Sequence, residues 1–270
     1  MKDLLELVRT RKSVRSFDGR KITEEDMAKL KAFAGTIQDP FGIPVRFIFL
    51  DAEENRLSCP VLTGERNYVA GAVEKKENAD LAFGYTFERL VLYAWSLGIG
   101  TTWIGGTMKR SLFESAAGIG EGERMPCMSP LGYPAAKRSL KESIMRKGVG
   151  ADSRMPAEKL FFEDSFDTPL SGEKQAEMGD LIELVRWAPS AVNKQPWRIV
   201  LKDGLYHFYE KHDKGYISDA VGDMQKIDIG IALCHFVMGL EESGRKPEVL
   251  IRDPGIKTAA DTEYVVTVRA

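Results

Sequence analysis

The sequence predicts an α+β fold made of two similar halves within one chain of 270 residues. Helical patterns alternate with short extended runs rich in β-branched and aromatic residues, as in α+β proteins. In addition, three pairs of segments resemble each other and follow the same order along the chain. We therefore expect an internal duplication, with one half in residues 1–150 and the other in residues 151–270.

The first two pairs of segments open each half. The tripeptide SFD occurs at 16–18 and again at 165–167. Farther on, DMAKLKAFA (26–34) matches DLIELVRWA (180–188). Both segments carry apolar residues at positions i, i+3 and i+6, which indicates amphipathic helices.

Each of these helices leads to an extended run that begins with proline. PVRFIFLD (44–51) and PWRIVLKD (196–203) have the composition of strands. Four more strands are expected, at 101–105, 127–133, 205–210 and 262–269.

The third pair of segments predicts two core helices. AFGYTFERLVLYAWSLG (82–98) aligns without a gap with DIGIALCHFVMGLEESG (228–244), so that Gly84 matches Gly230. Both segments end on glycine, the residue that commonly ends helices. Chance similarity among helices is the alternative, but three pairs in one order favour duplication. Two such halves would pack about a pseudo-twofold axis, as the subunits of a symmetric dimer do.

Composition argues against several classes of function. The net charge of −2 gives no general attraction for nucleic acid or anionic membranes. The three cysteines and three histidines are spaced for neither disulfides nor a metal site, so we expect no metal. No apolar run reaches the ~18 residues of a membrane span, and the charged N-terminus lacks a signal-peptide core. These features predict a cytoplasmic protein that acts on a small molecule.

The two halves differ where each meets its SFD tripeptide. RKSVR (11–15) precedes the first, whereas LFFED (160–164) precedes the second. Clustered guanidinium, ammonium and hydroxyl donors suit a phosphate, because charge-assisted hydrogen bonds contribute roughly 1.5–3 kcal/mol each. A solvated basic turn is the alternative. The candidate phosphate ligands are Arg11, Lys12, Ser13 and Arg15.

A second difference lies between helix and strand. The second half has PSAVNKQPW (189–197) where the first has GTIQDPFGIP (35–44). Two prolines stiffen the former loop, and its amides offer both donors and acceptors, as a heterocycle requires. A turn whose polar groups satisfy its own backbone is the alternative. Because one half keeps the basic cluster and the other keeps this loop, we expect one complete site at their junction.

Two further segments have the composition of binding loops. GIGTTWIGG (98–106) contains four glycines, which allow close approach of its backbone to a planar ring. LGYPAAKR (131–138) presents Lys137 and Arg138 as possible phosphate ligands. The alternatives are a glycine-rich helix exit for the first and surface charge for the second. The spacing of the glycines does not fit a dinucleotide-binding βαβ unit.

Together these motifs resemble the nitroreductase family of FMN-dependent oxidoreductases. RKSVRSF is similar to its N-terminal R-x-S-x-R-x-F motif, and APSAVNKQPW is similar to its A-P-S-x-x-N-x-Q-P-W stretch. In ordinary members the second motif precedes the glycine-rich loop, whereas here it follows it. That order resembles the fused subgroup, in which one chain imitates the dimer.

The resemblance implies a nitroreductase-like fold, with antiparallel or mixed sheets flanked by helices, arranged as an intramolecular pseudo-dimer. It implies one FMN between the halves, with the basic residues at the phosphate and ribityl end. The second-half residues that would line the flavin ring are Pro189, Ser190, Ala191, Asn193 and Gln195. Those near its reactive edge would be Trp103, Ile104, Gly105 and Gly106. No catalytic side chain is expected, since the cofactor carries the chemistry.

The implied activity is hydride transfer from NADH or NADPH, through flavin N5, to a nitroaromatic, a quinone or a similar acceptor. The implied assembly is a monomer that acts as a pseudo-dimer. An FMN-binding or other small-molecule-binding protein without redox turnover is the main alternative, and dehalogenation or flavin fragmentation is another. Fold alone does not separate these.

Overall fold

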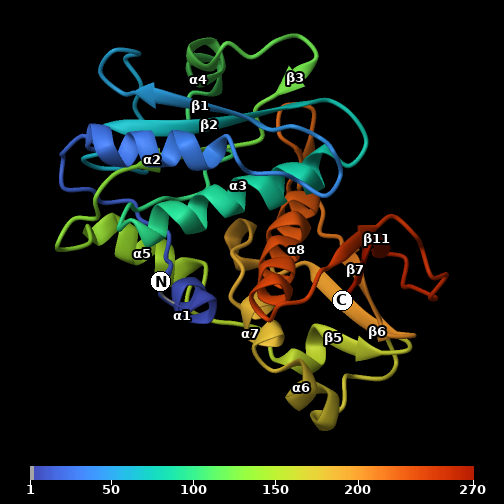
Figure 1. Cartoon of the computed structure of the whole chain (residues 1–270). Coiled ribbons are helices and arrows are strands. Elements are labelled where there is room, and N and C mark those ends of the chain that lie inside the picture. Colours follow the sequence, from blue (N-terminus) through green and yellow to red (C-terminus); the bar gives the residue numbers. More distant parts are fainter. Residues whose placement is uncertain (1–2) are drawn as a thin grey trace.

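The computed structural model describes residues 3–270 and places two sheets on either side of a pair of long helices (Figure 1). The first sheet contains β1 (Arg46–Asp51), β2 (Asn67–Glu74), β3 (Glu123–Arg124) and β4 (Met128–Leu131). Strand β2 pairs antiparallel with each of the other three. Helix α2 (Glu24–Ala34) lies along this sheet, and α4 (Arg110–Ala117) lies at its outer side.

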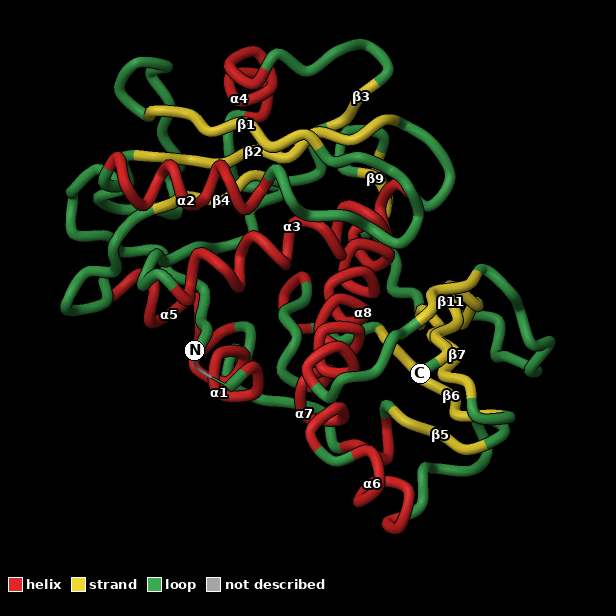
Figure 2. The backbone as a smooth tube through the Cα atoms, in the orientation of Figure 1, coloured by secondary structure: helices red, strands yellow, loops and turns green. Residues whose placement is uncertain are grey.

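The second sheet is mixed. Its order is β10 (Glu248–Leu250), β11 (Thr262–Arg269), β7 (Leu205–Lys211), β6 (Trp197–Lys202) and β5 (Phe161–Glu163). The β5–β6 pair is parallel and the others are antiparallel. Figure 2 shows this sheet beside α8. An α+β fold with antiparallel and mixed sheets, as the sequence predicts, is confirmed.

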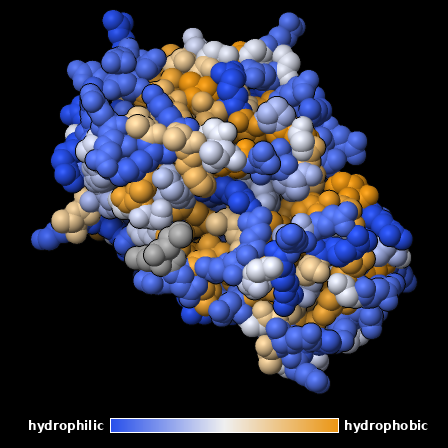
Figure 3. Space-filling model, in the orientation of Figure 1, coloured by the Kyte–Doolittle hydropathy of each residue, from blue (hydrophilic) through white to orange (hydrophobic). Residues whose placement is uncertain are grey.

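Shorter elements complete the chain. They are the helices α1 (Leu4–Thr10), α5 (Leu140–Gly148), α6 (Gly172–Met178) and α7 (Asp180–Arg186), the 3-10 turns η1 (Ala157–Lys159) and η2 (Ala191–Asn193), and the hairpin of β8 (Ile217–Ser218) with β9 (Gly222–Asp223). Within the described residues, none of the helices combines the length and apolar character that crossing a membrane requires. Figure 3 shows hydrophilic side chains over most of the visible face, with smaller apolar patches among them.

The two long helices, α3 (Ala79–Ser96) and α8 (Met224–Glu242), cross at the glycines that the sequence alignment pairs. A Cβ atom on Gly84 would overlap the backbone oxygen of Ile227. A Cβ atom on Gly230 would overlap the backbone of Leu81 and lie 3.1 Å from Cα of Gly84. Contact between equivalent residues is what a twofold axis through the crossing produces.

A second set of contacts across these helices also joins positions that the alignment relates to each other. The gapless alignment matches Glu88 with Cys234 and Arg89 with His235. In the structure, Oε1 of Glu88 lies 3.0 Å from Nε2 of His235, and Arg89 is near enough to Cys234 to affect the pKa of its thiol. The two pairs occupy equivalent positions in the alignment but differ in chemistry.

Most predicted elements are confirmed, and one strand is wrong. The helices predicted at 26–34, 82–98, 180–188 and 228–244 form with ends shifted by a few residues, and β11 spans 262–269. The segment 101–105 is not a strand. Its residues form only isolated bridges, among them Thr101 with Ser13 and Ile104 with Met128. Each neighbouring segment pairs with a single residue of this stretch, so no ladder of strand hydrogen bonds forms.

The helix crossing leads to a stability prediction. Substitution G84A should lower the free energy of unfolding by about 1–3 kcal/mol, because the added methyl group has no space against the α8 backbone. The control is G172A at the start of α6, where a Cβ atom would meet nothing within 4 Å and the change should stay within about 0.5 kcal/mol. Urea unfolding monitored by circular dichroism measures both values, and equal effects would contradict the close crossing.

Candidate functional site

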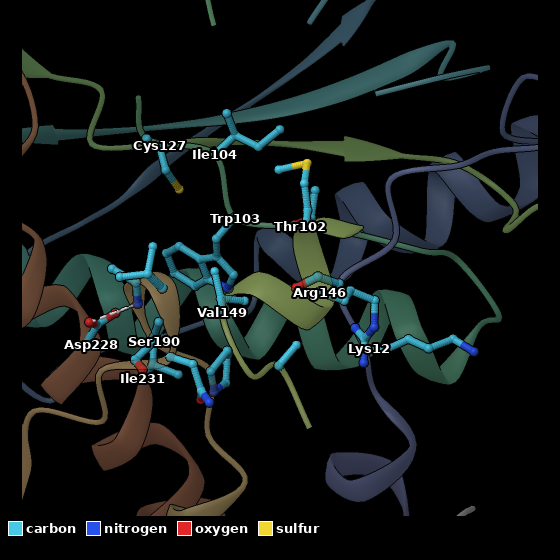
Figure 4. A pocket seen from close by; sticks show the side chains of 18 of the residues that line it. Lys12, Thr102, Trp103, Ile104, Cys127, Arg146, Val149, Ser190, Asp228 and Ile231 are labelled. Atoms are coloured by element: carbon cyan, nitrogen blue, oxygen red, sulfur yellow. Dashed lines mark hydrogen bonds between the residues drawn. The ribbon is translucent and has the colours of Figure 1, made fainter. Parts of the chain in front are cut away.

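A cavity of about 430 Å³ lies at the junction of the two predicted halves. Its walls come from segments far apart in the sequence: residues 9–15 and 102–107 on one side, and residues 187–193 and the first turns of α8 on the other. Its volume is within the range of small-molecule and cofactor sites. Figure 4 shows Trp103 in the middle of the labelled residues, with Asp228 and Ser190 to one side of it and Arg146 and Lys12 to the other.

The basic end of the cavity is built by the extended segment that follows α1. This segment runs beside the glycine-rich loop, where Val14 N–H donates to the carbonyl of Thr101 at 2.8 Å. Arg11 is buried, and its Nε and Nη1 atoms have no partner among the described residues. The Nε atom of Arg15 is also buried and unpartnered. Burial lowers the pKa of Arg11, although the Glu88 carboxylate opposes this shift and Arg146 adds to it.

Two arginines that the sequence did not single out complete the basic end. Arg146 in α5 is buried and forms an ion pair with Asp152. Arg154 stacks on the Trp187 ring, with 4.6 Å from its guanidinium carbon to the ring centroid, and its Nε atom is unpartnered. Burial, followed by repulsion from Arg11, lowers the pKa of Arg154 to about 10. Sequence reasoning missed both arginines because residues 145–160, which connect the two predicted halves, have no counterpart in the repeat.

The loop at 189–195 is held in an unusual backbone conformation. Val192, Asn193 and Gln195 have φ angles of 43°, 60° and 51°, in the left-handed region that residues other than glycine rarely adopt. Ser190 Oγ accepts from the N–H of Gln195 at 2.9 Å, which closes the loop on itself. Strained loops of this kind persist only when surrounding contacts fix them, and they are frequent at binding sites.

Further contacts fix this loop to the connection between the halves. Asn193 Nδ2 donates to the carbonyl of Gly150 at 2.8 Å, and Gln195 Oε1 accepts from Met155 N–H at 2.9 Å. These two contacts go to the backbone of another segment, whereas the alternative interpretation expects contacts with the loop's own backbone, such as those of Ser190 Oγ with Gln195 N–H and of Gln195 Nε2 with the Asn193 carbonyl. The loop nevertheless forms a wall of the cavity, because Pro189, Ser190, Ala191 and Asn193 line it.

A buried carboxyl group, Asp228 of α8, supports the loop from below. Its two oxygens lie 3.0 and 3.1 Å from the backbone nitrogen of Ala191, which donates to them (Figure 4). Burial raises the pKa of Asp228 well above its ordinary value. The Ala191 N–H group lowers this pKa, while repulsion from Glu210 and Asp223 raises it further. Sequence reasoning missed Asp228 inside an apolar helix, although its alignment with Ala82 marks a difference between the halves.

The indole of Trp103 is fixed by a buried pair that joins the two halves. Trp103 Nε1–H donates to Oε2 of Glu88 at 3.0 Å, and Glu88 Oε1 contacts His235. Nδ1 of His235 lies 2.9 Å from the carbonyl of Leu184, so that ring nitrogen carries a proton. The side chains of Glu88 and His235 are fully buried. The cavity wall near Trp103 is thus held by both α3 and α8.

Backbone donors remain available beside Trp103. The N–H group of Ile104 donates to the carbonyl of Met128 at 3.0 Å. The N–H groups of Gly105 and Gly106 make no hydrogen bond to other described residues, and both glycines line the cavity. These two donors, rather than that of Ile104, are free to contact a ligand.

The structure brings most of the predicted site residues together at this cavity. Its lining includes Arg11, Lys12, Ser13, Arg15, Trp103, Ile104, Gly105, Gly106, Arg138, Pro189, Ser190, Ala191 and Asn193. Two predicted residues lie outside the lining. Lys137 is exposed to solvent, and Gln195 is buried behind the loop, where its side chain bonds to Met155 and Asn193. The geometry therefore does not support direct ligand contact by Lys137 or Gln195.

Comparisons with known proteins agree on one family. The family model described as "Putative TM nitroreductase" matches residues 3–240. The structure of "a putative nitroreductase" from Thermotoga maritima aligns over 98% of this chain and 93% of its own, with 20% identity and a TM-score of 0.63, which shows a shared fold. A search of curated proteins finds no match.

Smaller nitroreductases align with part of the chain. A nitroreductase family protein from Clostridium difficile 630 covers 58% of this chain and 94% of its own, with 17% identity and a TM-score of 0.46. An FMN-dependent nitroreductase from Clostridium difficile R20291 covers 52% of this chain and 94% of its own, with 16% identity and a TM-score of 0.41.

The raised pKa of Asp228 leads to a pH prediction. Between the ordinary aspartate pKa and the raised one, the folded state binds more protons than the unfolded state, so stability falls as pH rises, by up to about 1.4 kcal/mol per pH unit for this group. Substitution D228N keeps an oxygen for the Ala191 N–H group and removes the titration. We expect the variant to gain stability over the wild type from about pH 5 to pH 8 in urea unfolding. A constant difference across this range would contradict the assignment.

Proposed function

Because the chain belongs to the family described as "Putative TM nitroreductase", we propose that it is an FMN-dependent oxidoreductase with one FMN per chain in the junction cavity. When bound, FMN would supply the redox chemistry, namely hydride transfer from NADH or NADPH through flavin N5 to a nitroaromatic, a quinone or a similar acceptor. The protein binds and orients the reactants.

The observation that carries this proposal is the set of unpaired guanidinium nitrogens. Nε and Nη1 of Arg11, Nε of Arg15 and Nε of Arg154 are all buried and have no partner among the described residues, and the three arginines line one cavity. Buried donors of this kind are costly unless a ligand satisfies them. A phosphate monoester offers several acceptor oxygens and up to two negative charges, so the phosphate of FMN fits this donor set. Ser13 borders the same end with a hydroxyl group.

The opposite end of the cavity suits the flavin ring. Trp103, Ile104 and Ala191 offer apolar surface, and the free N–H groups of Gly105 and Gly106 offer hydrogen-bond donors for ring heteroatoms. Asp228 accepts the Ala191 N–H group and thereby holds the loop beside the ring. Glu88 and His235 keep the Trp103 indole in one orientation. Fixed walls lower the entropic cost of orienting a bound ring.

We further propose that the chain is a monomer in which duplicated halves imitate a dimer. The packing of Gly84 on Gly230 and the equivalent positions of the Glu88 and Arg89 pairs support this interpretation. The cavity takes its basic segment from the first half and its strained loop from the second, which supports one complete site per chain. The predicted division at residue 150 falls in the connection that carries Arg146 and Arg154.

Arg11 gives a test of FMN binding with two readouts of opposite sign. Substitution R11A should weaken FMN binding at least about tenfold, because it removes charge-assisted bonds to the phosphate. The same substitution should raise the melting temperature of the FMN-free protein, because a buried unpaired cation is removed. The control K29A alters an exposed lysine that pairs with Glu25 on α2, and it should leave both values unchanged. Flavin fluorescence quenching measures the affinity. If R11A bound FMN as tightly as the wild type does, the assignment of Arg11 as a phosphate ligand would be contradicted.

Redox activity is tested separately by anaerobic addition of NADH or NADPH to the FMN-loaded protein. We expect the flavin absorbance to bleach and to return when a quinone or nitroaromatic is added. A protein that binds FMN but leaves it oxidised with both nucleotides would instead be a non-redox flavin-binding protein. A protein that binds no FMN would contradict the cofactor assignment itself.

A further inference from the structure

A second polar cluster lies outside the lining of the cavity, where β7 ends and α8 begins. Glu210 is near the end of β7, His212 follows that strand, and Asp223 caps α8. Each of the three side chains offers one possible ligand atom, and these atoms all lie within 4.8 Å of one another. The cluster combines an imidazole with two carboxylates that come from two separate elements.

Glu210 is the feature that requires an explanation. Its side chain is fully buried, and neither carboxylate oxygen has a hydrogen-bond partner among the described residues. Oε1 lies 2.7 Å from Nδ1 of His212, in an orientation that gives no hydrogen bond. Buried carboxylates are otherwise paired, hydrogen-bonded or bound to a metal. Around a tetrahedral ion with bonds of about 2.0–2.2 Å, two ligand atoms lie roughly 3.3–3.6 Å apart, so these two atoms would separate slightly when an ion binds.

The groups around Glu210 favour a cation. Asp223 offers a second carboxylate within 4.8 Å, and Oε2 of Glu263 lies 3.5 Å from Nε2 of His212. The nearby cationic side chains are already paired, Lys226 with Glu263 at 2.8 Å and Arg124 with Asp80. Among the described residues, the imidazole of His212 is the group that faces the Glu210 carboxyl group.

The other two side chains each have a possible ligand atom close to Glu210, although Nε2 of His212 also lies 3.5 Å from Oε2 of Glu263. Asp223 uses Oδ1 to accept the N–H groups of Gln225 and Lys226 at the start of α8, and its Oδ2 makes no hydrogen bond within the described chain. The His212 side chain is 31% exposed, so solvent reaches the cluster there. A surface hollow lined by Asp80, Asp223 and Lys226 borders it on another side and provides a path for an ion.

We propose that Glu210, His212 and Asp223 bind one divalent transition-metal ion, of the class of Zn²⁺, with water in the remaining position. The imidazole favours such ions over Mg²⁺ and Ca²⁺, which prefer oxygen ligands throughout. The ion ties the end of β7 to the first turn of α8, the helix that carries Asp228 to the cavity wall. Its role is structural, and it does not depend on the bound flavin. The spacing of these three residues matches no common metal motif, so the metal site is not indicated by the sequence alone.

The test is calorimetric titration of the purified, tag-free, FMN-loaded protein with zinc chloride, after treatment with EDTA and removal of the chelator. The wild type should bind one Zn²⁺ per chain, and its melting temperature should rise with Zn²⁺ concentration. H212Q and E210Q should each lower the affinity at least about tenfold. The matched control is D213N, which removes the carboxylate next to His212 that pairs with Lys194 instead. It should bind as the wild type does.

Two outcomes would overturn the proposal. One is the absence of saturable Zn²⁺ binding in the wild type. The other is binding to H212Q that is as tight as binding to D213N. Because His212 is partly exposed, H212Q should fold even if E210Q does not, and circular dichroism of each variant establishes this before titration. The flavin spectrum, recorded in parallel, separates this result from the fate of the proposed function.

Discussion

The close crossing of α3 and α8 is the constraint on which the rest of the structure depends. Two glycines allow the helix backbones to touch, and no other residue fits at either position without moving a backbone. The crossing brings Glu88 within reach of His235, and this pair in turn holds Trp103 at the cavity wall. It also fixes where α8 begins, and therefore where Asp228 meets the strained loop. A change in the crossing would move both sides of the cavity.

The buried charges around the cavity lower the stability of the ligand-free protein and suit the binding of an anionic ligand. Buried guanidinium groups without partners cost free energy in the ligand-free protein, and so does a loop with three residues at positive φ. The corresponding positions of the other half lack this chemistry, since LFFED replaces RKSVR and Ala82 replaces Asp228. Unpaired positive charge and the strained loop therefore meet at one cavity. Departures from ordinary folding rules of this kind are expected at functional sites.

The sequence predicted the fold well because its repeat could be aligned. The helices α3 and α8 and the strands β1, β6, β7 and β11 follow from that alignment and from periodicity. The strand β2 was missed because its glycine and alanines weaken the strand signal, although nearly all of it is buried. The predicted strand at 101–105 was wrong because strand pairing depends on neighbours that local composition does not reveal. Three cavity residues were not predicted, because only tertiary packing brings them to the cavity; they are Arg146, Arg154 and Asp228.

We propose that two unequal halves build a single cofactor site within one chain. Native mass spectrometry of the FMN-saturated protein, with mass resolution sufficient to count chains and flavins together, tests this proposal. We expect a species of one chain with one FMN at saturation. Two FMN molecules on one chain would mean that each half keeps its own site, and FMN bound only to an assembly of two chains would mean that the site lies between chains. Either result would contradict the account.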